Sequence, residues 1–313
     1  MARMIVIRVI HSLLVLLAVS FVIFMAVEVL PGDVARRMLG REAPEESLAI
    51  LRAQMGLNEP ILYRYVHWLG NALTFDFGMS FANRRPVWDI IAPRLANTAM
   101  LGAIALILYL PIVLVTAMIQ ATHRDYPIDH VLTVATIIVL STPEFLLGTL
   151  MLLCFGLWLN WFPVVSTLYS GMSLAQLGSA LILPAVSLAI IMSTHAVRML
   201  RDNLIETLDS EFVTMAEFKG LSPLRILMRH VLPNALGPTL NITALNLSYV
   251  IGGVVLIERV FVFPGFGSLM IDSLQLRDVP LIEACVLIAA SVYILGNLVA
   301  DIVSIWLNPK LQT

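Results

Sequence analysis

Long apolar blocks divide the sequence, and they restrict the chain to a membrane fold. A helix needs about 20 apolar residues to cross a bilayer. Six blocks are long enough, and they lie near 9–30, 98–121, 131–159, 177–198, 237–257 and 284–307. The chain is 59% hydrophobic and only 13% charged, whereas soluble domains are nearer half apolar and a quarter charged. We therefore expect an all-α integral membrane protein with six transmembrane helices.

Basic residues in the short connecting segments predict the orientation of the chain. The segments 160–176 and 258–283 contain only Arg259 and Arg277. The segments on the opposite side, which include the loop 199–236, contain Arg3, Arg8, Arg124, Arg198, Arg201, Lys219, Arg225, Arg229 and Lys310. Since short basic segments stay in the cytoplasm, both termini and the loop 199–236 are expected to be cytoplasmic.

The spans and this orientation divide the chain into segments with different surroundings. The expected order is a cytoplasmic N-terminus (1–8), a first span (9–30), a periplasmic segment with interfacial helices (31–97), five further spans (98–307) and a cytoplasmic tail (308–313). The first span follows basic residues, as a signal peptide does, but it has no small-residue cleavage pattern, so we interpret it as uncleaved. In the periplasmic segment, Gly56 predicts a helix end and Pro60 the start of a helix whose Tyr63 and Trp68 suit the membrane interface.

Polar residues and prolines inside the spans indicate candidates for a translocation pathway. Pro111, Pro143 and Pro184 should kink their helices. Glu144 is the clearest carboxyl at membrane depth, where a carboxylate costs roughly 2.5–3.5 kcal/mol. It could face a substrate, cap the kink or lie near the membrane interface. The fifth span has polar side chains that could line a pathway or could bond to other helices, and these are Asn241, Asn246 and Ser248.

The sequence lacks the motifs of catalysis and of cofactor binding. It has no Walker phosphate loop, GxGxxG, HExxH or paired CxxC, and its six histidines show no metal-ligand spacing. Cys154 and Cys285 fall inside apolar blocks, where packing is their expected role. We expect no enzyme activity, cofactor, metal site or nucleic-acid partner. Two other classes of membrane protein are alternatives. An integral membrane enzyme would need clustered catalytic groups, and the sequence has none. An ion-coupled carrier would need inverted repeats with buried titratable groups, and neither is clear in the sequence.

The cytoplasmic loop predicts two short helices. The first, 211–220, has a narrow apolar face and ends at Gly220, a residue typical of helix ends. Ser222 and Pro223 are typical of a cap and a first helical position, so the second helix should cover 223–232. The face expected to be apolar in the first helix consists of Phe212, Met215, Ala216 and Lys219.

The second helix is expected to separate apolar from basic residues. Arg225 and Arg229 lie opposite an apolar face made of Leu224, Leu227, Met228 and Val231. Pro233 and Pro238 predict a turn into the fifth span. We call residues 211–233 the elbow. It could dock a partner, or it could be an ordinary solvated loop.

The elbow also resembles a known family. AEFKG (216–220) followed by RHVLPNA (229–235) is similar to the cytoplasmic loop motif of permease subunits of binding-protein-dependent ATP-binding cassette (ABC) importers, in the branch for dipeptides, oligopeptides and nickel. In that motif an alanine and a glycine four residues apart precede a Leu-Pro pair, as Ala216 and Gly220 do here. The resemblance extends along the chain through PGD (31–33), DFGMS (76–80), STPEFLLG (141–148), ERVFVFPGFG (258–267) and RDVP (277–280). The first permease of the paired subunits is the better match.

The resemblance implies a complex in the bacterial inner membrane. A second homologous permease would complete the pathway, two ATP-binding subunits would lie in the cytoplasm, and a periplasmic binding protein would deliver peptides, with nickel or another small solute as the alternative. The elbow would then be the coupling helix, with Glu211, Met215, Ala216, Glu217, Phe218, Lys219, Gly220, Ser222 and Pro223 as its coupling residues. Glu217 and Phe218 replace a short Arg-Ala pair common in the family, and this replacement bears on which ATPase docks.

Overall fold

The computed structural model describes residues 2–28, 44–54, 59–169, 171–252 and 254–307, and no strand occurs in these ranges. The predictions that concern Gly56, residues 31–33 and the tail 308–313 lie outside the described residues. In chain order the helices are α1 (Ala2–Glu28), α3 (Glu45–Gln54), α4 (Ile61–Leu73), α5 (Val87–Thr122), α6 (Pro127–Ser141), α7 (Glu144–Met151), the π-helical η1 (Leu152–Trp158), α8 (Leu174–Leu208), α9 (Glu211–Phe218), α10 (Pro223–Ile226), the π-helical η2 (Leu227–Val231), α11 (Leu232–Gly252), α12 (Val255–Val260), α13 (Phe266–Leu276) and α14 (Val279–Leu307).

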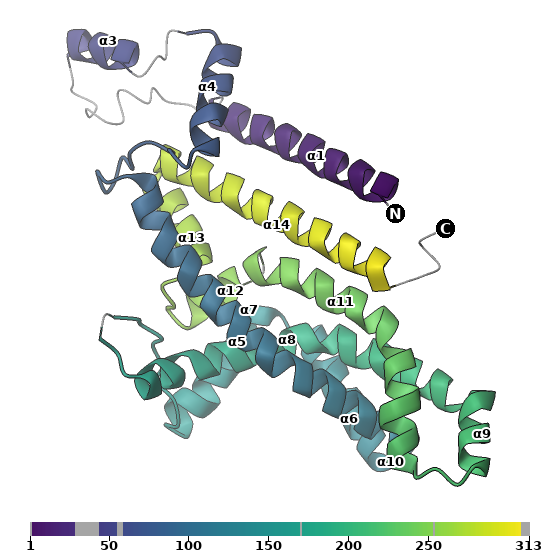
Figure 1. The fold of residues 1–313 in the computed structure, drawn as a ribbon. Coiled ribbons are helices and arrows are strands. Elements are labelled where there is room, and N and C mark those ends of the chain that lie inside the picture. Colours follow the sequence, from purple (N-terminus) through teal and green to yellow (C-terminus); the bar gives the residue numbers. More distant parts are fainter. Residues whose placement is uncertain (1, 29–43, 55–58, 170, 253, 308–313) are drawn as a thin grey trace.

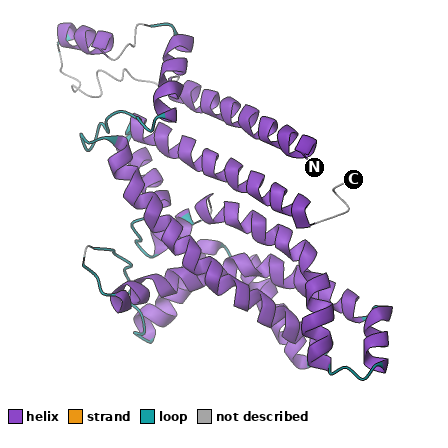
Figure 2. Cartoon of the chain, viewed as in Figure 1, coloured by secondary structure: helices purple, strands orange, loops and turns teal. Residues whose placement is uncertain are grey.

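The long helices run between two ends of the molecule (Figure 1). The start of α1, the α5–α6 turn, α9, α10 and the end of α14 lie at one end, which we call the elbow end. The start of α5, together with α4 and α13, lies at the opposite end, which we call the far end. Figure 2 shows that loops join the helices at both ends. The segments expected on one side of the membrane therefore share one end of the molecule.

The expected membrane spans correspond to helices of the structure. Four are long and apolar enough to cross a bilayer, namely Ile5–Ala26, Val87–Thr122, Leu174–Leu208 and Val279–Val299. The α6 and α7 segments form a fifth such unit, bent by 114°. α11 covers most of the fifth expected span. Among the described residues it is not one of the helices apolar enough to count as a span, because its polar residues lower its mean hydropathy. The prediction of an all-α membrane protein is confirmed.

The sequence predicted that the third span is one helix with a kink, but the structure has two separate helices there. α6 ends at Ser141, Thr142 is extended with a ψ of 129°, and α7 begins after Pro143. The reason is that a residue before proline avoids the helical region, and proline has no N–H to continue the hydrogen-bond ladder. Pro111 and Pro184, in contrast, lie inside the uninterrupted helices α5 and α8.

The main core forms where α5 packs along α8. Alanines from both helices are buried there, and small side chains let membrane helices approach closely. α11 and the elbow contribute to the same cluster. The buried alanines are Ala105, Ala117, Ala121, Ala185, Ala189 and Ala196. The elbow, α8 and α11 are therefore joined to α5 in one packed cluster.

The helix expected after Pro60 is confirmed as α4, which packs across the far end of α1. The Tyr65 hydroxyl lies 2.8 Å from Ser20 Oγ, and Arg64 forms an ion pair with Glu28 at 2.6 Å. Tyr65 also makes an edge contact with Phe24. α4 therefore braces the first span at the far end.

Candidate functional site

α9, the first arm of the elbow, ends in a turn that requires glycine. Gly220 has a φ of +76°, a region that other residues rarely adopt. Its N–H donates to the Glu217 carbonyl at 2.8 Å, and the Leu221 N–H donates to the Ala216 carbonyl at 3.3 Å. These two bonds make a Schellman ending, with Gly220 at its left-handed position. The predicted stop at Gly220 is confirmed.

The second arm begins as predicted but ends differently. Pro223 is the first residue of α10, and the Ile226 N–H donates to the Ser222 carbonyl at 3.0 Å. The predicted turn between Pro233 and Pro238 is wrong, because η2 continues directly into α11. Pro233, which has no N–H, therefore lies inside a continuous helix, directly after a π-helical turn in which the Leu232 N–H donates to the Leu227 carbonyl. The second arm is therefore fused to the fifth membrane segment.

One face of the elbow is buried against the core of the molecule. Val213 and Ala216 of α9 are buried, as are Ile226 of α10 and Val231 of η2, and all four belong to the α5–α8 core cluster. Of the predicted apolar stripe of the first arm, only Ala216 is buried, whereas Phe212, Met215 and Lys219 are exposed. The structure instead buries Val213 and Ala216, at i and i+3, in the core cluster, and periodicity alone did not identify this face.

Large apolar side chains are left exposed on the elbow. Phe218 is the most exposed, at 82%. Lys219, Arg225 and Arg229 are also exposed. The exposed apolar residues of the elbow are Phe212, Met215, Phe218, Leu224 and Met228. An exposed apolar surface on a firmly packed helix pair suits a groove on another chain.

The other implied coupling residues lie on the same two arms. Glu211 is the first residue of α9, where a carboxylate suits the positive end of the helix. Glu217 is exposed beside Phe218, and Ser222 and Pro223 are exposed at the start of the second arm. The structure therefore brings these residues together at the elbow, with Ala216 as the buried exception.

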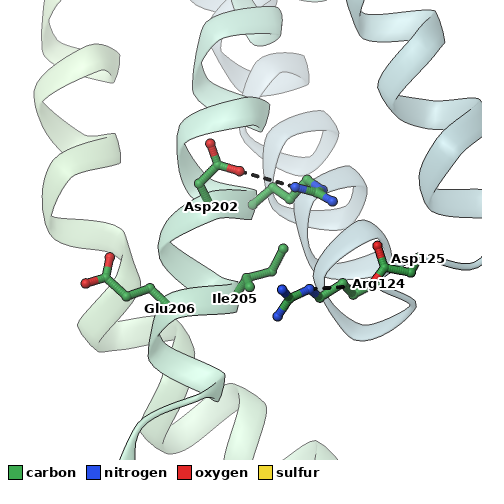
Figure 3. A pocket seen from close by; sticks show the side chains of 6 residues that line it. Arg124, Asp125, Asp202, Ile205 and Glu206 are labelled. Atoms are coloured by element: carbon green, nitrogen blue, oxygen red, sulfur yellow. Dashed lines mark hydrogen bonds and ion pairs between the residues drawn. The ribbon is translucent and has the colours of Figure 1, made fainter.

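A shallow charged pocket lies above the elbow, between α8 and the α5–α6 turn (Figure 3). Arg201 of α8 donates two hydrogen bonds to the buried Asp129 of α6, at 2.7 and 2.9 Å, and one to Asp202 at 3.2 Å. Arg124 donates to Asp209 at 3.0 Å. These pairs tie α6 and the α5–α6 turn to the helix that leads into the elbow.

The pathway candidates occupy several places. Asn246 donates to the Met192 carbonyl of α8 at 3.1 Å, which is a bond between helices. Glu144 is the first residue of α7, at the positive end of that helix after the break. The side chains of Asn241 and Ser248 lie outside the described residues.

Two buried carboxylates at the far end were not identified from the sequence. Glu258 is fully buried and accepts hydrogen bonds from Thr98 Oγ1 at 2.5 Å and from the Ser268 N–H at 2.8 Å. Burial raises the pKa of the Glu258 carboxyl above its ordinary value, although these hydrogen bonds oppose the shift. Asp278 accepts from Ser80 Oγ at 2.5 Å. The available signal was a charged pair, Glu258 and Arg259, within the otherwise apolar run LIERVF (256–261).

Comparisons with known proteins match the chain to a family of membrane transport components. The family described as binding-protein-dependent transport system inner membrane component matches residues 113–313, and its N-terminal counterpart matches residues 1–102. The glutathione transport system permease protein GsiC of Escherichia coli (strain K12) is 32% identical over 297 residues, covering 95% of this chain and 94% of its own. The probable peptide ABC transporter permease protein y4tP of Sinorhizobium fredii is 31% identical over 305 residues, 97% of each chain.

These matches extend over nearly the whole chain, and they identify a multi-pass inner-membrane protein that acts in a complex with other ABC transporter subunits. Its role is transport and not enzymatic catalysis. The chain therefore belongs to the family of inner-membrane components of binding-protein-dependent transport systems, as a permease subunit in the branch that contains the peptide importers.

Proposed function

We propose that this chain forms half of a translocation pathway for peptides and that its elbow couples the pathway to ATP hydrolysis. A second, homologous permease supplies the other half, and two ATPases bind from the cytoplasm. A periplasmic binding protein delivers the peptide at the far end. The similarity to a glutathione permease and to a probable peptide permease supports this class of substrate.

The exposed apolar side chains of the elbow carry the proposal. Buried interface anchors are commonly aromatic residues near the centre of a contact. Phe218 is such a candidate, because it is 82% exposed and lies two residues after the buried Ala216 in the same helix. The basic residues Lys219, Arg225 and Arg229 would face acidic groups of the ATPase.

The elbow can pass movement into the membrane through its buried face. Val213 and Ala216 pack into the same cluster as α5 and α8, while η2 continues into α11. Closure of the ATPases would therefore shift these helices together as a rigid body.

The test compares two charge-introducing variants in the complete complex. Phe218→Asp should release the ATPases, because it places a carboxylate in the proposed apolar contact. Leu174→Asp is the matched control, since Leu174 is 88% exposed but lies at the start of α8, away from the elbow. Co-purification of the ATPases is measured for both variants, and the Leu174→Asp complex should retain them.

Uptake into vesicles, with the cognate binding protein present, then addresses the substrate. A labelled dipeptide and glutathione should enter in an ATP-dependent manner, and Phe218→Asp should abolish entry. Retention of the ATPases by Phe218→Asp would contradict docking at the elbow. Uptake of nickel alone would contradict the peptide assignment.

A further inference from the structure

The first turn of α13 is held by groups from elsewhere in the chain. A helix N-terminus has N–H groups without partners inside the helix. Here the Phe266 N–H donates to Thr98 Oγ1 at 2.8 Å, and the Ser268 N–H donates to Glu258 Oε2 at 2.8 Å. The Gly267 N–H also bonds to the Glu258 carboxylate. Glu258 of α12 and Thr98 of α5 therefore share the capping of α13.

Thr98 connects this cap to the long helix α5. Its hydroxyl accepts from Phe266 and donates to Glu258 Oε1 at 2.5 Å, so it has one bond to each side of the cap. The neighbouring Asn97 donates to the Pro264 carbonyl at 2.8 Å. Two consecutive residues of α5 thus hold the loop between α12 and α13.

Two glycines make this close approach possible. A Cβ on Gly265 would lie 2.0 Å from Glu258 Oε1, and a Cβ on Gly267 would lie 2.8 Å from the Val255 backbone Cα. The carboxylate has no room to retreat, because Glu258 has no exposed surface. The close packing leaves α12, α13 and the start of α5 as one body.

α5 reaches from this body to the core behind the elbow. It has 36 residues, and a helix rises 1.5 Å per residue, so its length is about 54 Å. Near its other end, Ala117 and Ala121 belong to the core cluster that contains Val213 and Ala216 of the elbow. The cluster runs along α5 from Leu101 to Ala121, so it begins one turn after Thr98 and continues to the elbow.

We propose that Glu258 and Thr98 are positioning residues for transport. Together they fix α13 to α5, so that movement delivered to α5 at the elbow end also moves the far end, where the binding protein delivers its substrate. This inference rests on the proposed function. Without the tether, ATPases would still dock and hydrolyse ATP, but the far end would no longer follow them.

The experiment uses the complete complex, reconstituted with its binding protein. Thr98→Val removes the hydroxyl at nearly constant size, and Thr98→Ser retains it. Arg259→Gln is the control, because it breaks a half-exposed ion pair with Asp272 in the same region without touching the cap. The measurements are ATPase co-purification, basal ATP hydrolysis, hydrolysis stimulated by the binding protein, and uptake.

In Thr98→Val, co-purification and basal hydrolysis should stay unchanged, while stimulated hydrolysis and uptake fall about tenfold. Thr98→Ser and Arg259→Gln should behave as the unaltered complex does. Normal uptake in Thr98→Val, or an equal loss in Thr98→Ser, would overturn the proposal. Failure of Thr98→Val to assemble would also overturn it, since the cap would then serve folding alone. Failure of the proposed coupling would show separately, as retention of ATPases by Phe218→Asp.

Discussion

At the scale of single residues, a substitution at Gly220 tests the cost of backbone strain without a change in side-chain packing. Nothing lies within 4 Å of a Cβ added at Gly220, so only its φ of +76° opposes a larger residue. Gly220→Ala should therefore lower the free energy of unfolding by about 1–2 kcal/mol, the cost of a left-handed conformation for an L-residue. Thermal unfolding of the detergent-solubilised complex measures this change.

Gly237→Ala is the matched control for this prediction. Gly237 lies inside α11, and nothing lies within 4 Å of a Cβ added there either, but its φ is not positive. Alanine should stabilise the protein there by up to about 1 kcal/mol, because glycine is a poor helix former. Equal effects of the two substitutions would contradict the role assigned to the Gly220 turn.

Residue chemistry explains which details the sequence could predict. Gly220 and Pro223 act through the backbone, so their positions predicted a helix stop and a helix start correctly. The burial of Val213 and the exposure of Met215 depend on where α8 and α10 lie, and local periodicity does not contain that information. Glu258 was missed for the same reason, because its partner Thr98 lies 160 residues earlier in the chain.

At the scale of helices, the ion pair between α6 and α8 provides a test of element packing. Asp129 is 1% exposed and accepts two hydrogen bonds from Arg201, whereas Asp202, the other partner of Arg201, is 71% exposed. Asp129→Asn should lower the free energy of unfolding by about 1–3 kcal/mol, because Arg201 loses its buried counter-charge. Asp202→Asn should have little effect, since an exposed pair contributes little.

Thermal unfolding of the two variants measures the difference. The ion pair holds α6 against the helix that leads into the elbow, so ATPase co-purification should also weaken in Asp129→Asn and stay normal in Asp202→Asn. Identical unfolding temperatures for the two variants would contradict the role of Asp129 as the anchor.

Helix existence was more predictable from the sequence than helix geometry. The apolar blocks located every long helix, since hydropathy is a property of the local sequence. The 114° bend after Ser141 was expected only as a kink, because a proline predicts where a ladder breaks but not the angle that neighbouring helices impose. Pro233 predicted a turn that η2 removes by continuing directly into α11.

At the scale of the whole molecule, the two ends differ in their basic residues. Lys219, Arg225 and Arg229 are exposed at the elbow end. The far end has arginines mainly in the segment 31–97, which exceeds the length of about 60 residues at which loop charge stops determining orientation. We infer that the elbow end is cytoplasmic, and cysteine labelling in spheroplasts tests this orientation.

Two exposed residues serve as the labelling sites, Arg85 at the far end and Arg124 at the elbow end. The parent chain measures the background from Cys154 and the buried Cys285. A membrane-impermeant maleimide should label Arg85→Cys in intact spheroplasts, and it should label Arg124→Cys only after permeabilisation. Labelling of Arg124→Cys in intact spheroplasts would place the elbow outside the cell, where no ATPase subunit could reach it, and both the orientation and the coupling proposal would then be wrong.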